Sequence, residues 1–330
     1  MPVESVNVLV IAPIGDECLR QIANISPRIK VVDASDLFRA EQEGDFTSKA
    51  QFDALLAEAE VIYGLRLPQN VFARAPKLKW VQVMLAGVDR FLDNEFLQSS
   101  VTMTSISGFN IDTVAEFALQ LMLMSVKQAP LCFRLKQEKQ WKRFTPTVLR
   151  SKTVGIVGLG NIGREVARLA KAFGMRVVAV EVKRVARARY VDIVLPPEQL
   201  PQLLSESDFV VLALPLTPET NKLIGERELR AMKSTAYLIN VARGKIVDEE
   251  ALIRALDEQW IAGAGLDVFA TEPLPTESRL WELPNVIFSP HVAGLLADHN
   301  IRATEVFCEN LRRYLSGKKL LNLIDKKKGY

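Results

Sequence analysis

The chain has 330 residues, of which 48% are hydrophobic and 25% charged, and its formal net charge is +3. This composition is that of an ordinary globular protein, and so small a net charge gives no support to a nucleic-acid partner. The length exceeds what a single hydrophobic core usually reaches, so we expect two domains.

Cysteine and histidine are too scarce for a disulfide framework or a metal site. The chain has two histidines and three cysteines, Cys18, Cys132 and Cys308, which are far apart and form no CxxC motif. Such a set favours a reducing compartment. The N-terminus lacks the basic region of a signal peptide, and the most apolar stretch, residues 117–126, is too short to cross a bilayer. We therefore expect a cytoplasmic protein with no membrane contact and no metal.

Strand-like and helix-like segments alternate in the first third of the chain. Helical patterns, such as the one over residues 49–59, separate the apolar runs. These strand-like runs cover residues 6–12, 29–34, 61–64, 78–84 and 101–106. Strands that alternate with helices predict right-handed βαβ units and a parallel sheet.

The same alternation starts again at Thr153. Apolar runs there predict six strands, at residues 153–158, 175–181, 209–215, 236–241, 262–268 and 286–289. Six strands with crossover connections are the number in a complete dinucleotide-binding sheet. The fold class expected from the sequence is therefore α/β, with two Rossmann-like, doubly wound parallel sheets.

A long apolar helix is predicted between the two sets of strands, over residues 112–129. It suits a buried connection between domains, and its wide apolar surface also suits the interface of a homodimer. A second helix, near residues 298–316, is expected to return to the first domain. We therefore assign residues 1–106 plus 297–330 to a substrate domain and residues 107–296 to a dinucleotide-binding domain.

The segment VGIVGLGNIGREV carries Gly158, Gly160 and Gly163 as GxGxxG, between a predicted strand and a predicted helix. In this context the motif is a strong fingerprint for dinucleotide binding. Gly158 permits the tight turn, and Gly163 permits close packing of the helix on the strand. Gly160 lets backbone N–H groups, including those of Asn161 and Ile162, approach a pyrophosphate at the positive end of the helix.

Glu181 ends the next predicted strand and bears on the choice of cofactor. A carboxylate at this position accepts hydrogen bonds from the ribose hydroxyls and repels a 2′-phosphate, which favours NAD. Lys183 and Arg184 follow directly and are able to pair with the 2′-phosphate of NADP. The sequence thus favours NAD as cofactor, with NADP as the alternative.

Polar side chains follow three consecutive predicted strands of the second set. Arg243 comes after the strand 236–241, Asp267 and Glu272 lie at and after the end of the next strand, and His291 follows the last one. Ligands of open α/β sheets bind at the carboxyl ends of the strands. A guanidinium group there can hold a carboxylate with two hydrogen bonds, and an imidazole can transfer a proton.

The blocks GLGNIG, ALPLTPET, NVARGKIVDE, LDVFATEPLP and SPHVAG resemble those of the D-isomer-specific 2-hydroxyacid dehydrogenases. The similarity runs from about residue 77 to residue 321 and is dense over residues 153–294. It implies a flavodoxin-like substrate domain, an NAD(P)-binding Rossmann domain, and reversible reduction of a 2-keto acid to a D-2-hydroxy acid. It also implies a catalytic triad of Arg243, Glu272 and His291.

The resemblance further implies which residues contact the ligands. Arg243 would clamp the carboxylate of the substrate, His291 would exchange a proton with its oxygen, and the N–H groups of Ala86 and Gly87 would also meet the carboxylate. Asp267 would contact the nicotinamide amide. The remaining cofactor contacts fall on Pro215, Thr220, Val241, Ala242, His291 and Gly294.

The substrate stays open at this point. A glyoxylate or hydroxypyruvate reductase is the main interpretation, and a D-3-phosphoglycerate dehydrogenase-like enzyme or a non-enzymatic NAD(H)-sensing, corepressor-like protein are the alternatives. Arg66 is expected to form a surface ion pair rather than to bind a second anionic group of the substrate. Trp141 is expected to pack in the ordinary way rather than to reach a pocket or the partner subunit.

Overall fold

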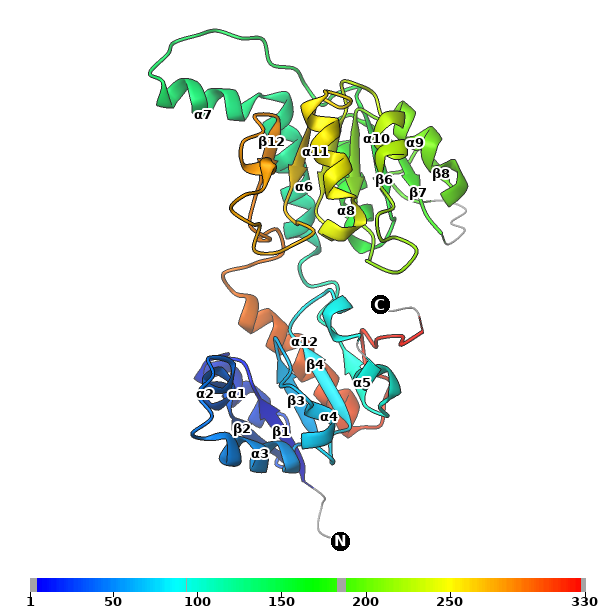
Figure 1. The fold of residues 1–330 in the computed structure, drawn as a ribbon. Helices are drawn as coiled ribbons and strands as arrows, with labels where there is room; N and C mark the ends of the chain where they lie inside the picture. Colours follow the sequence, from blue (N-terminus) through cyan, green and yellow to red (C-terminus); the bar gives the residue numbers. More distant parts are fainter. Residues whose placement is uncertain (1–4, 93, 183–187, 328–330) are drawn as a thin grey trace. The chain divides into compact units, whose positions relative to one another are not determined.

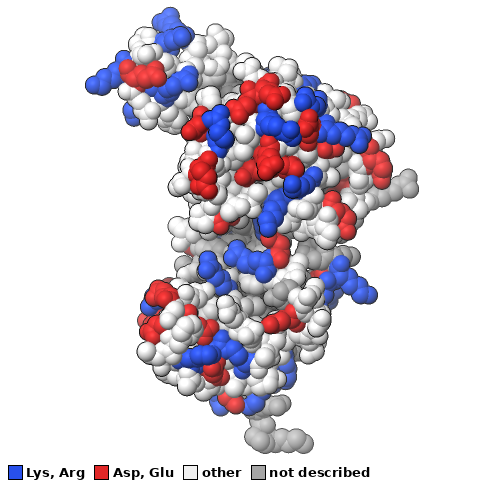
Figure 2. Space-filling view, viewed as in Figure 1, with Lys and Arg blue, Asp and Glu red and all other residues white. Residues whose placement is uncertain are grey.

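A computed structural model describes residues 5–92, 94–182 and 188–327 (Figure 1). The chain divides into unit 1, formed by Met1–Phe109 and Leu296–Tyr330, and unit 2, formed by Asn110–Leu295. Each unit contains one parallel β-sheet. Figure 2 shows acidic and basic side chains intermixed over the face in view, in keeping with the low net charge.

The sheet of unit 1 has the strand order β2-β1-β3-β4-β5, and all its pairs are parallel. This is the flavodoxin-like order, in which the direction of strand addition reverses between β1 and β3. The strands are β1 (Val6–Val10), β2 (Ile29–Asp33), β3 (Val61–Gly64), β4 (Trp80–Val83) and β5 (Thr102–Thr104).

Helices cover both faces of this sheet, since β1 sends Leu9 into one apolar core and Val8 into the other. The helices are α1 (Asp16–Ala23), α2 (Ser35–Gln42), α3 (Lys49–Glu58), α4 (Val71–Arg74), α5 (Asn94–Gln98) and α12 (His299–Leu315), with a 3-10 turn η1 at Asp89–Phe91. Helix α12 belongs to the core of unit 1. The ring of Phe307 stacks on Tyr63 with 4.2 Å between centroids, and Asn310 Nδ2 donates to Gln82 Oε1 at 2.9 Å.

The sheet of unit 2 has the order β12-β11-β10-β9-β6-β7-β8, again with parallel pairs. With β6 as the first strand, this is the Rossmann order 3-2-1-4-5-6 with one further strand beside the sixth. The strands are β6 (Thr153–Val157), β7 (Arg176–Val180), β8 (Ile193–Leu195), β9 (Phe209–Leu212), β10 (Tyr237–Asn240), β11 (Gly263–Leu266) and β12 (Val286–Phe288).

The prediction of six strands is wrong, because the described part of unit 2 contains seven. The strand that the sequence pattern missed is β8. It is three residues long, it lies at the edge of the sheet, and its first residue, Ile193, is 37% exposed. So short a run gives neither the alternation of a half-buried strand nor the continuous apolar stretch of a central one.

Two layers of helices enclose the sheet of unit 2. Val210 and Leu238 face one core, and their neighbours Val211 and Ile239 face the other, as expected for strands buried on both sides. The helices are α6 (Ile111–Val126), α7 (Ala129–Gln137), α8 (Asn161–Ala172), α9 (Leu200–Glu206), α10 (Glu226–Ala231) and α11 (Glu249–Asp257), with 3-10 turns η2 (Pro197–Gln199), η3 (Gly244–Ile246) and η4 (Arg279–Trp281).

The predicted helix over residues 112–129 is wrong at its C-terminal end, because α6 stops at Val126. Gln128 has a φ of 53°, which no α-helix accommodates, and α7 starts after it in a new direction. Figure 1 shows α7 and the following loop standing away from the rest of unit 2. None of the helices in the described part of the chain is both long and apolar enough to cross a membrane.

Candidate active site

The glycine loop joins β6 to α8, and each of its glycines has a different reason to lack a side chain. Gly158 has a φ of 96°, and a Cβ there would lie 2.6 Å from the carbonyl oxygen of Ala213. A Cβ on Gly163 would lie 2.1 Å from the carbonyl oxygen of Gly158, so the helix could not approach the strand. Around Gly160, which caps α8, a Cβ would meet no atom within 4 Å. That open space over the helix N-terminus fits a pyrophosphate group.

Glu181 lies beside this loop. It follows the last residue of β7, and its Oε2 accepts a hydrogen bond from the backbone N–H of Leu159 at 2.8 Å. The structure therefore brings together the carboxylate and the glycine loop that the sequence assigned to one cofactor. Lys183 and Arg184 lie outside the described residues.

Arg243 lies in the turn that follows β10, and Asn240 shapes that turn. The Nδ2 of Asn240 donates to the Arg243 carbonyl oxygen at 3.0 Å, and its Oδ1 accepts from Ala242 N at 3.1 Å. The guanidinium group donates through one Nη to the carbonyl oxygen of Ala242 at 2.7 Å. Asn240 is not among the residues predicted from the sequence, although a buried amide at the end of an apolar strand is a signal for such a turn.

Gly244 ties this turn to the loop that carries Glu272. A Cβ at Gly244 would lie 1.9 Å from the carbonyl carbon of Phe269 and 2.4 Å from Ala270 N. The two loops therefore touch through their backbones, and any larger residue at position 244 would push Arg243 and Glu272 apart. This backbone contact ties the turn of Arg243 to the loop of Glu272.

Glu272 and His291 form a hydrogen-bonded pair. Glu272 Oε2 lies 2.7 Å from His291 Nδ1, and the other carboxylate oxygen accepts from Phe269 N at 3.0 Å. The side chains are 35% and 41% exposed, so the pair is open to a ligand. With Nδ1 bound to the carboxylate, His291 keeps Nε2 for another partner, and no described residue occupies it. An imidazole held in this way can act as a general acid or base.

Asp267 holds the backbone that carries His291. It is 1% exposed, and its Oδ1 accepts from Ser289 Oγ at 2.6 Å and from Val292 N at 2.9 Å. Its Oδ2 accepts from Ala293 N at 3.1 Å. The backbone carbonyl of Asp267 accepts from His291 N at 2.8 Å. The resemblance implies a contact with the cofactor for this residue, which stays a prediction; the hydrogen bonds give it a structural role.

His291 needs that support because its φ is 55°. The left-handed region costs a residue with a side chain about 1–3 kcal/mol, and such a conformation persists only where the surroundings enforce it. Asp267 supplies these constraints on both sides of the residue, at Ser289 and at Val292. The hydrogen bonds of Asp267 therefore maintain the strained backbone conformation of His291.

Asp267→Asn is expected to lower the free energy of unfolding of unit 2 by about 1–3 kcal/mol, because one of the three donors would then face an amide NH₂ group. Turnover should fall as well, since the His291 backbone loses its constraint. Urea unfolding and steady-state rates check both effects. Asp257→Asn, an exposed change in α11, serves as the control. A variant as stable and as active as the control would contradict the role of Asp267.

The remaining predicted cofactor residues lie in loops after strands of unit 2. Thr220 Oγ1 donates to the carbonyl oxygen of Pro215 at 2.7 Å, which closes the turn after β9. Val241 and Ala242 are buried beside Arg243, and the Gly294 carbonyl accepts from Asn110 Nδ2 at 3.4 Å. Their role in binding the cofactor stays a prediction.

Ala86 and Gly87 belong to unit 1, in the loop between β4 and η1. The N–H groups of both residues donate to no other described residue. Free backbone donors in a loop after a strand are suitable groups for an anion. Among the described residues, no group of three His, Cys, Asp or Glu side chains is placed to hold a metal ion.

Comparison with known families gives a match to the D-isomer specific 2-hydroxyacid dehydrogenase, NAD binding domain, over residues 119–293. Glyoxylate reductase from Korarchaeum cryptofilum is 40% identical over 263 residues, which are 78% of this chain and 79% of the relative. Glyoxylate reductase from Pyrococcus horikoshii is 35% identical over 312 residues, 88% of this chain and 91% of that protein.

Solved structures are similar over nearly the whole chain. A D-isomer specific 2-hydroxyacid dehydrogenase from Xanthobacter autotrophicus, in complex with NADPH and MES, is 33% identical with a TM-score of 0.84 and covers 99% of this chain and 100% of its own. An NADPH-dependent glyoxylate/hydroxypyruvate reductase from Sinorhizobium meliloti, in complex with NADP and sulfate, is 27% identical with a TM-score of 0.82 and the same coverage.

Proposed function

Because the chain belongs to the D-isomer-specific 2-hydroxyacid dehydrogenases, which are NAD(P)-dependent oxidoreductases, we propose that it reduces glyoxylate, and with it hydroxypyruvate, to the 2-hydroxy acid. The observation that carries this proposal is the Glu272–His291 pair, 2.7 Å apart, beside the turn of Arg243. The glyoxylate reductases among the relatives support the choice of substrate.

In the proposed mechanism the bound reduced nicotinamide supplies the hydride, and the chain supplies the proton and the electrostatic stabilisation. His291 donates the proton from Nε2 to the carbonyl oxygen of the substrate, while Glu272 fixes the ring through its hydrogen bond to Nδ1. Arg243 holds the substrate carboxylate with two hydrogen bonds and stabilises the charge that develops on the oxygen. The N–H groups of Ala86 and Gly87, which donate to no other described residue, are the groups of unit 1 that we propose for binding a substrate carboxylate. In the oxidation direction His291 is the base.

We propose the glycine loop and Glu181 as the main cofactor contacts, with Asp267 close to the nicotinamide amide. The chain binds NAD(P) as a member of its family. The hydrogen bond from Leu159 N to Glu181 supports NAD, because it keeps a negative charge beside the loop where a 2′-phosphate would be repelled. The NADPH and NADP complexes of the two solved relatives support NADP instead.

The first experiment follows the loss of reduced-nicotinamide absorbance, with NADH and NADPH in parallel, on glyoxylate, hydroxypyruvate, pyruvate and phosphohydroxypyruvate. We expect the highest kcat/KM on glyoxylate or hydroxypyruvate, and a preference for NADH that falls at least tenfold in Glu181→Ser. Fast turnover restricted to phosphohydroxypyruvate would contradict the substrate assignment. Tight NADH binding without any turnover would favour a sensing protein.

We also propose that the chain forms a homodimer, because the segment from α7 to residue 148 exposes large apolar side chains. Trp141 is 95% exposed, Phe133 59% and Val148 56%. The expectation that Trp141 packs in the ordinary way within the chain is therefore wrong. Large exposed apolar side chains in one segment mark an interaction surface. Light scattering after size exclusion should give a dimer for the native chain and a smaller mass for Phe133→Ser/Trp141→Ser, and a native monomer would overturn this proposal.

The compartment also remains a proposal. The three cysteines are free, with Cys18 and Cys308 buried and Cys132 exposed. Burial raises the pKa of the Cys308 thiol to about 11, which keeps it in the unreactive protonated form. Free thiols of this kind support a reducing compartment such as the cytoplasm.

A further inference from the structure

His299 is the second histidine of the chain, and the proposed mechanism gives it no task. It is the first residue of α12, and its Nε2 lies 3.1 Å from the carbonyl oxygen of Met84, which follows β4. A carbonyl oxygen only accepts hydrogen bonds, so Nε2 carries a proton and donates it to this bond. The ring also packs against Phe109 at right angles, with 5.0 Å between the ring centroids.

The other ring nitrogen of His299 has no partner. Among the described residues, its Nδ1 is the only buried side-chain nitrogen or oxygen without a hydrogen bond. A buried polar atom in this state destabilises the folded chain. A phenylalanine at position 299 would lack that atom and could still pack against Phe109. What a histidine contributes here is therefore the hydrogen bond from Nε2 to Met84.

Met84 begins the loop that we assign to the substrate carboxylate. It is fully buried, and its N–H donates to the Gly64 carbonyl at 2.9 Å. The carbonyl oxygen of the next residue, Leu85, accepts from Ile106 N at 3.1 Å. In a planar trans peptide the N–H points opposite to the C=O, so the Leu85 carbonyl also sets the direction of the Ala86 N–H. The bonds to two successive carbonyls, from His299 and from Ile106, therefore orient the peptide units that lead into Ala86.

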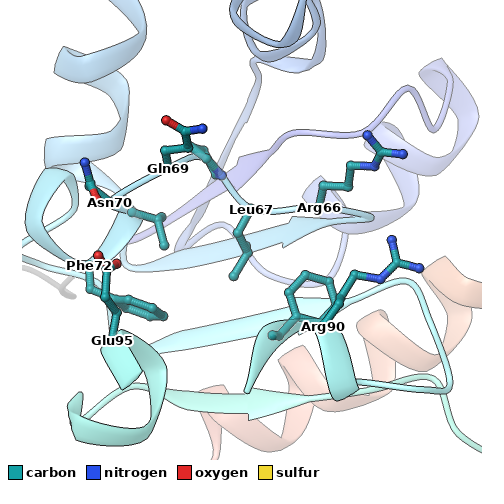
Figure 3. Close-up of a pocket in the computed structure, with 10 residues that line it drawn as sticks. Arg66, Leu67, Gln69, Asn70, Phe72, Arg90 and Glu95 are labelled. Carbon is teal, nitrogen blue, oxygen red and sulfur yellow. The ribbon is translucent and has the colours of Figure 1, made fainter. Parts of the chain in front are cut away.

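The other end of this loop borders a cavity. The chain passes from Gly87 to η1, and a space of about 490 Å³ lies between η1 with α5 and the loop after β3 (Figure 3). Figure 3 shows the side chains of Arg66 and Arg90 on one side of this space, and neither forms an ion pair with a described residue. The ion pair expected for Arg66 is therefore wrong. Because this side of η1 faces open space, the hydrogen bonds at the start of the loop matter more for its shape.

Asn300, the next residue of α12, forms a comparable bond to a different loop. Its Nδ2 donates to the Pro13 carbonyl at 3.0 Å, in the loop between β1 and α1. The first turn of α12 thus donates to the loops that follow two strands, but only the bond of His299 leads to Ala86 and Gly87. Asn300 therefore offers a matched control for the role of His299.

We propose that His299 is a positioning residue for substrate binding, and that its bond to the Met84 carbonyl keeps the N–H groups of Ala86 and Gly87 in place for the substrate carboxylate. This assignment rests on the proposed function, because it takes that loop as the carboxylate site. A contact with the carboxylate is the same in the bound substrate and in the transition state. Loss of the His299 bond should therefore raise KM and leave kcat nearly unchanged.

The test compares His299→Phe, which keeps an aromatic ring beside Phe109, with His299→Gln, whose amide can place a donor close to the position of Nε2. Initial rates on glyoxylate should give a KM about tenfold higher in His299→Phe, the effect of one lost hydrogen bond, with kcat within about twofold of the native value. His299→Gln should restore KM to within about threefold of the native value. Asn300→Ala should keep the native KM and kcat. If His299→Phe does not fold, His299→Asn, whose amide is too short to reach Met84, takes its place.

Hydrogen exchange over residues 84–91, followed by mass spectrometry, measures the order of the loop without any turnover. The amides of this segment should exchange about tenfold faster in His299→Phe than in the native chain, and His299→Gln should reverse that change.

A native KM in His299→Phe would overturn the assignment. So would a KM in His299→Gln as high as in His299→Phe, or the same rise in Asn300→Ala, because the donor to Met84 would then be irrelevant. Failure of the proposed function has a different signature, since the native chain would then turn over no keto acid. In that case the exchange rates decide: faster exchange that His299→Gln reverses supports the role of His299, and unchanged exchange overturns it.

Discussion

His291→Asn is expected to lower kcat on glyoxylate by about 10²–10⁴-fold, the usual contribution of a positioned general acid. Asparagine tolerates the left-handed backbone that His291 adopts, with its φ of 55°, so the loop should keep its shape. The amide of asparagine cannot deliver a proton to the carbonyl oxygen. The measurement pairs steady-state turnover with a fluorescence titration of NADH, whose affinity should stay close to the native value.

Two further measurements isolate the proton transfer in that experiment. The unfolding midpoint should be nearly unchanged in His291→Asn, which separates lost chemistry from lost structure. Glu272→Gln should also reduce turnover, because it removes the negative charge of the carboxylate, whose Oε2 lies 2.7 Å from Nδ1 of the histidine. Turnover of His291→Asn within a factor of two of the native enzyme would remove the histidine from the mechanism.

Arg243→Ala is expected to lower kcat/KM for glyoxylate by about 10²–10⁴-fold. A charged hydrogen bond contributes about 1.5–3 kcal/mol, and a bidentate guanidinium contributes two of them to the carboxylate. Arg243→Lys should recover only a small part of the loss, since an ammonium group cannot form the parallel pair. Initial rates over a range of glyoxylate concentrations separate the effects on KM and on kcat.

Lys245→Met is the matched control for this experiment. Lys245 is exposed and lies two residues further along the same turn, so its loss changes the local charge equally. Guanidinium ion added to Arg243→Ala should restore part of the activity, and it should have no effect on the control. An Arg243→Ala variant with native kcat/KM would exclude the carboxylate clamp. An equal loss of kcat/KM in Lys245→Met would show that any lost positive charge in this turn has the same effect, and that Arg243 makes no specific contact.

The features that could be predicted from the sequence are those that depend on residues close together in the chain. The glycine loop lies between a strand and a helix, as GxGxxG requires, and Arg243, Asp267 and His291 each follow a strand whose apolar run is unmistakable. Local patterns of this kind depend on neighbours a few residues apart. They can therefore be recognised from the sequence alone, before the fold is known.

The features that the sequence missed depend on residues far apart in the chain. The partners of the Asp267 carboxylate lie 22 to 26 residues further on, at Ser289, Val292 and Ala293. The approach of Arg66 and Arg90 to one cavity depends on the pairing of β3 with β4. The end of α6 depends on the left-handed backbone of Gln128. Glutamine is a good helix former, so its presence in the sequence does not indicate that conformation.

Unit 1 combines two segments that are far apart in the chain, so its parts are synthesised at different times. Residues 110–295 are continuous and can fold as soon as they leave the ribosome, because domains generally fold as units during translation. Val8, Tyr63 and Trp80 are made much earlier, but they share their core with Phe307 and Leu311 of α12. One face of the sheet of unit 1 therefore stays uncovered until α12 has been translated, and its apolar side chains are open to aggregation during that time.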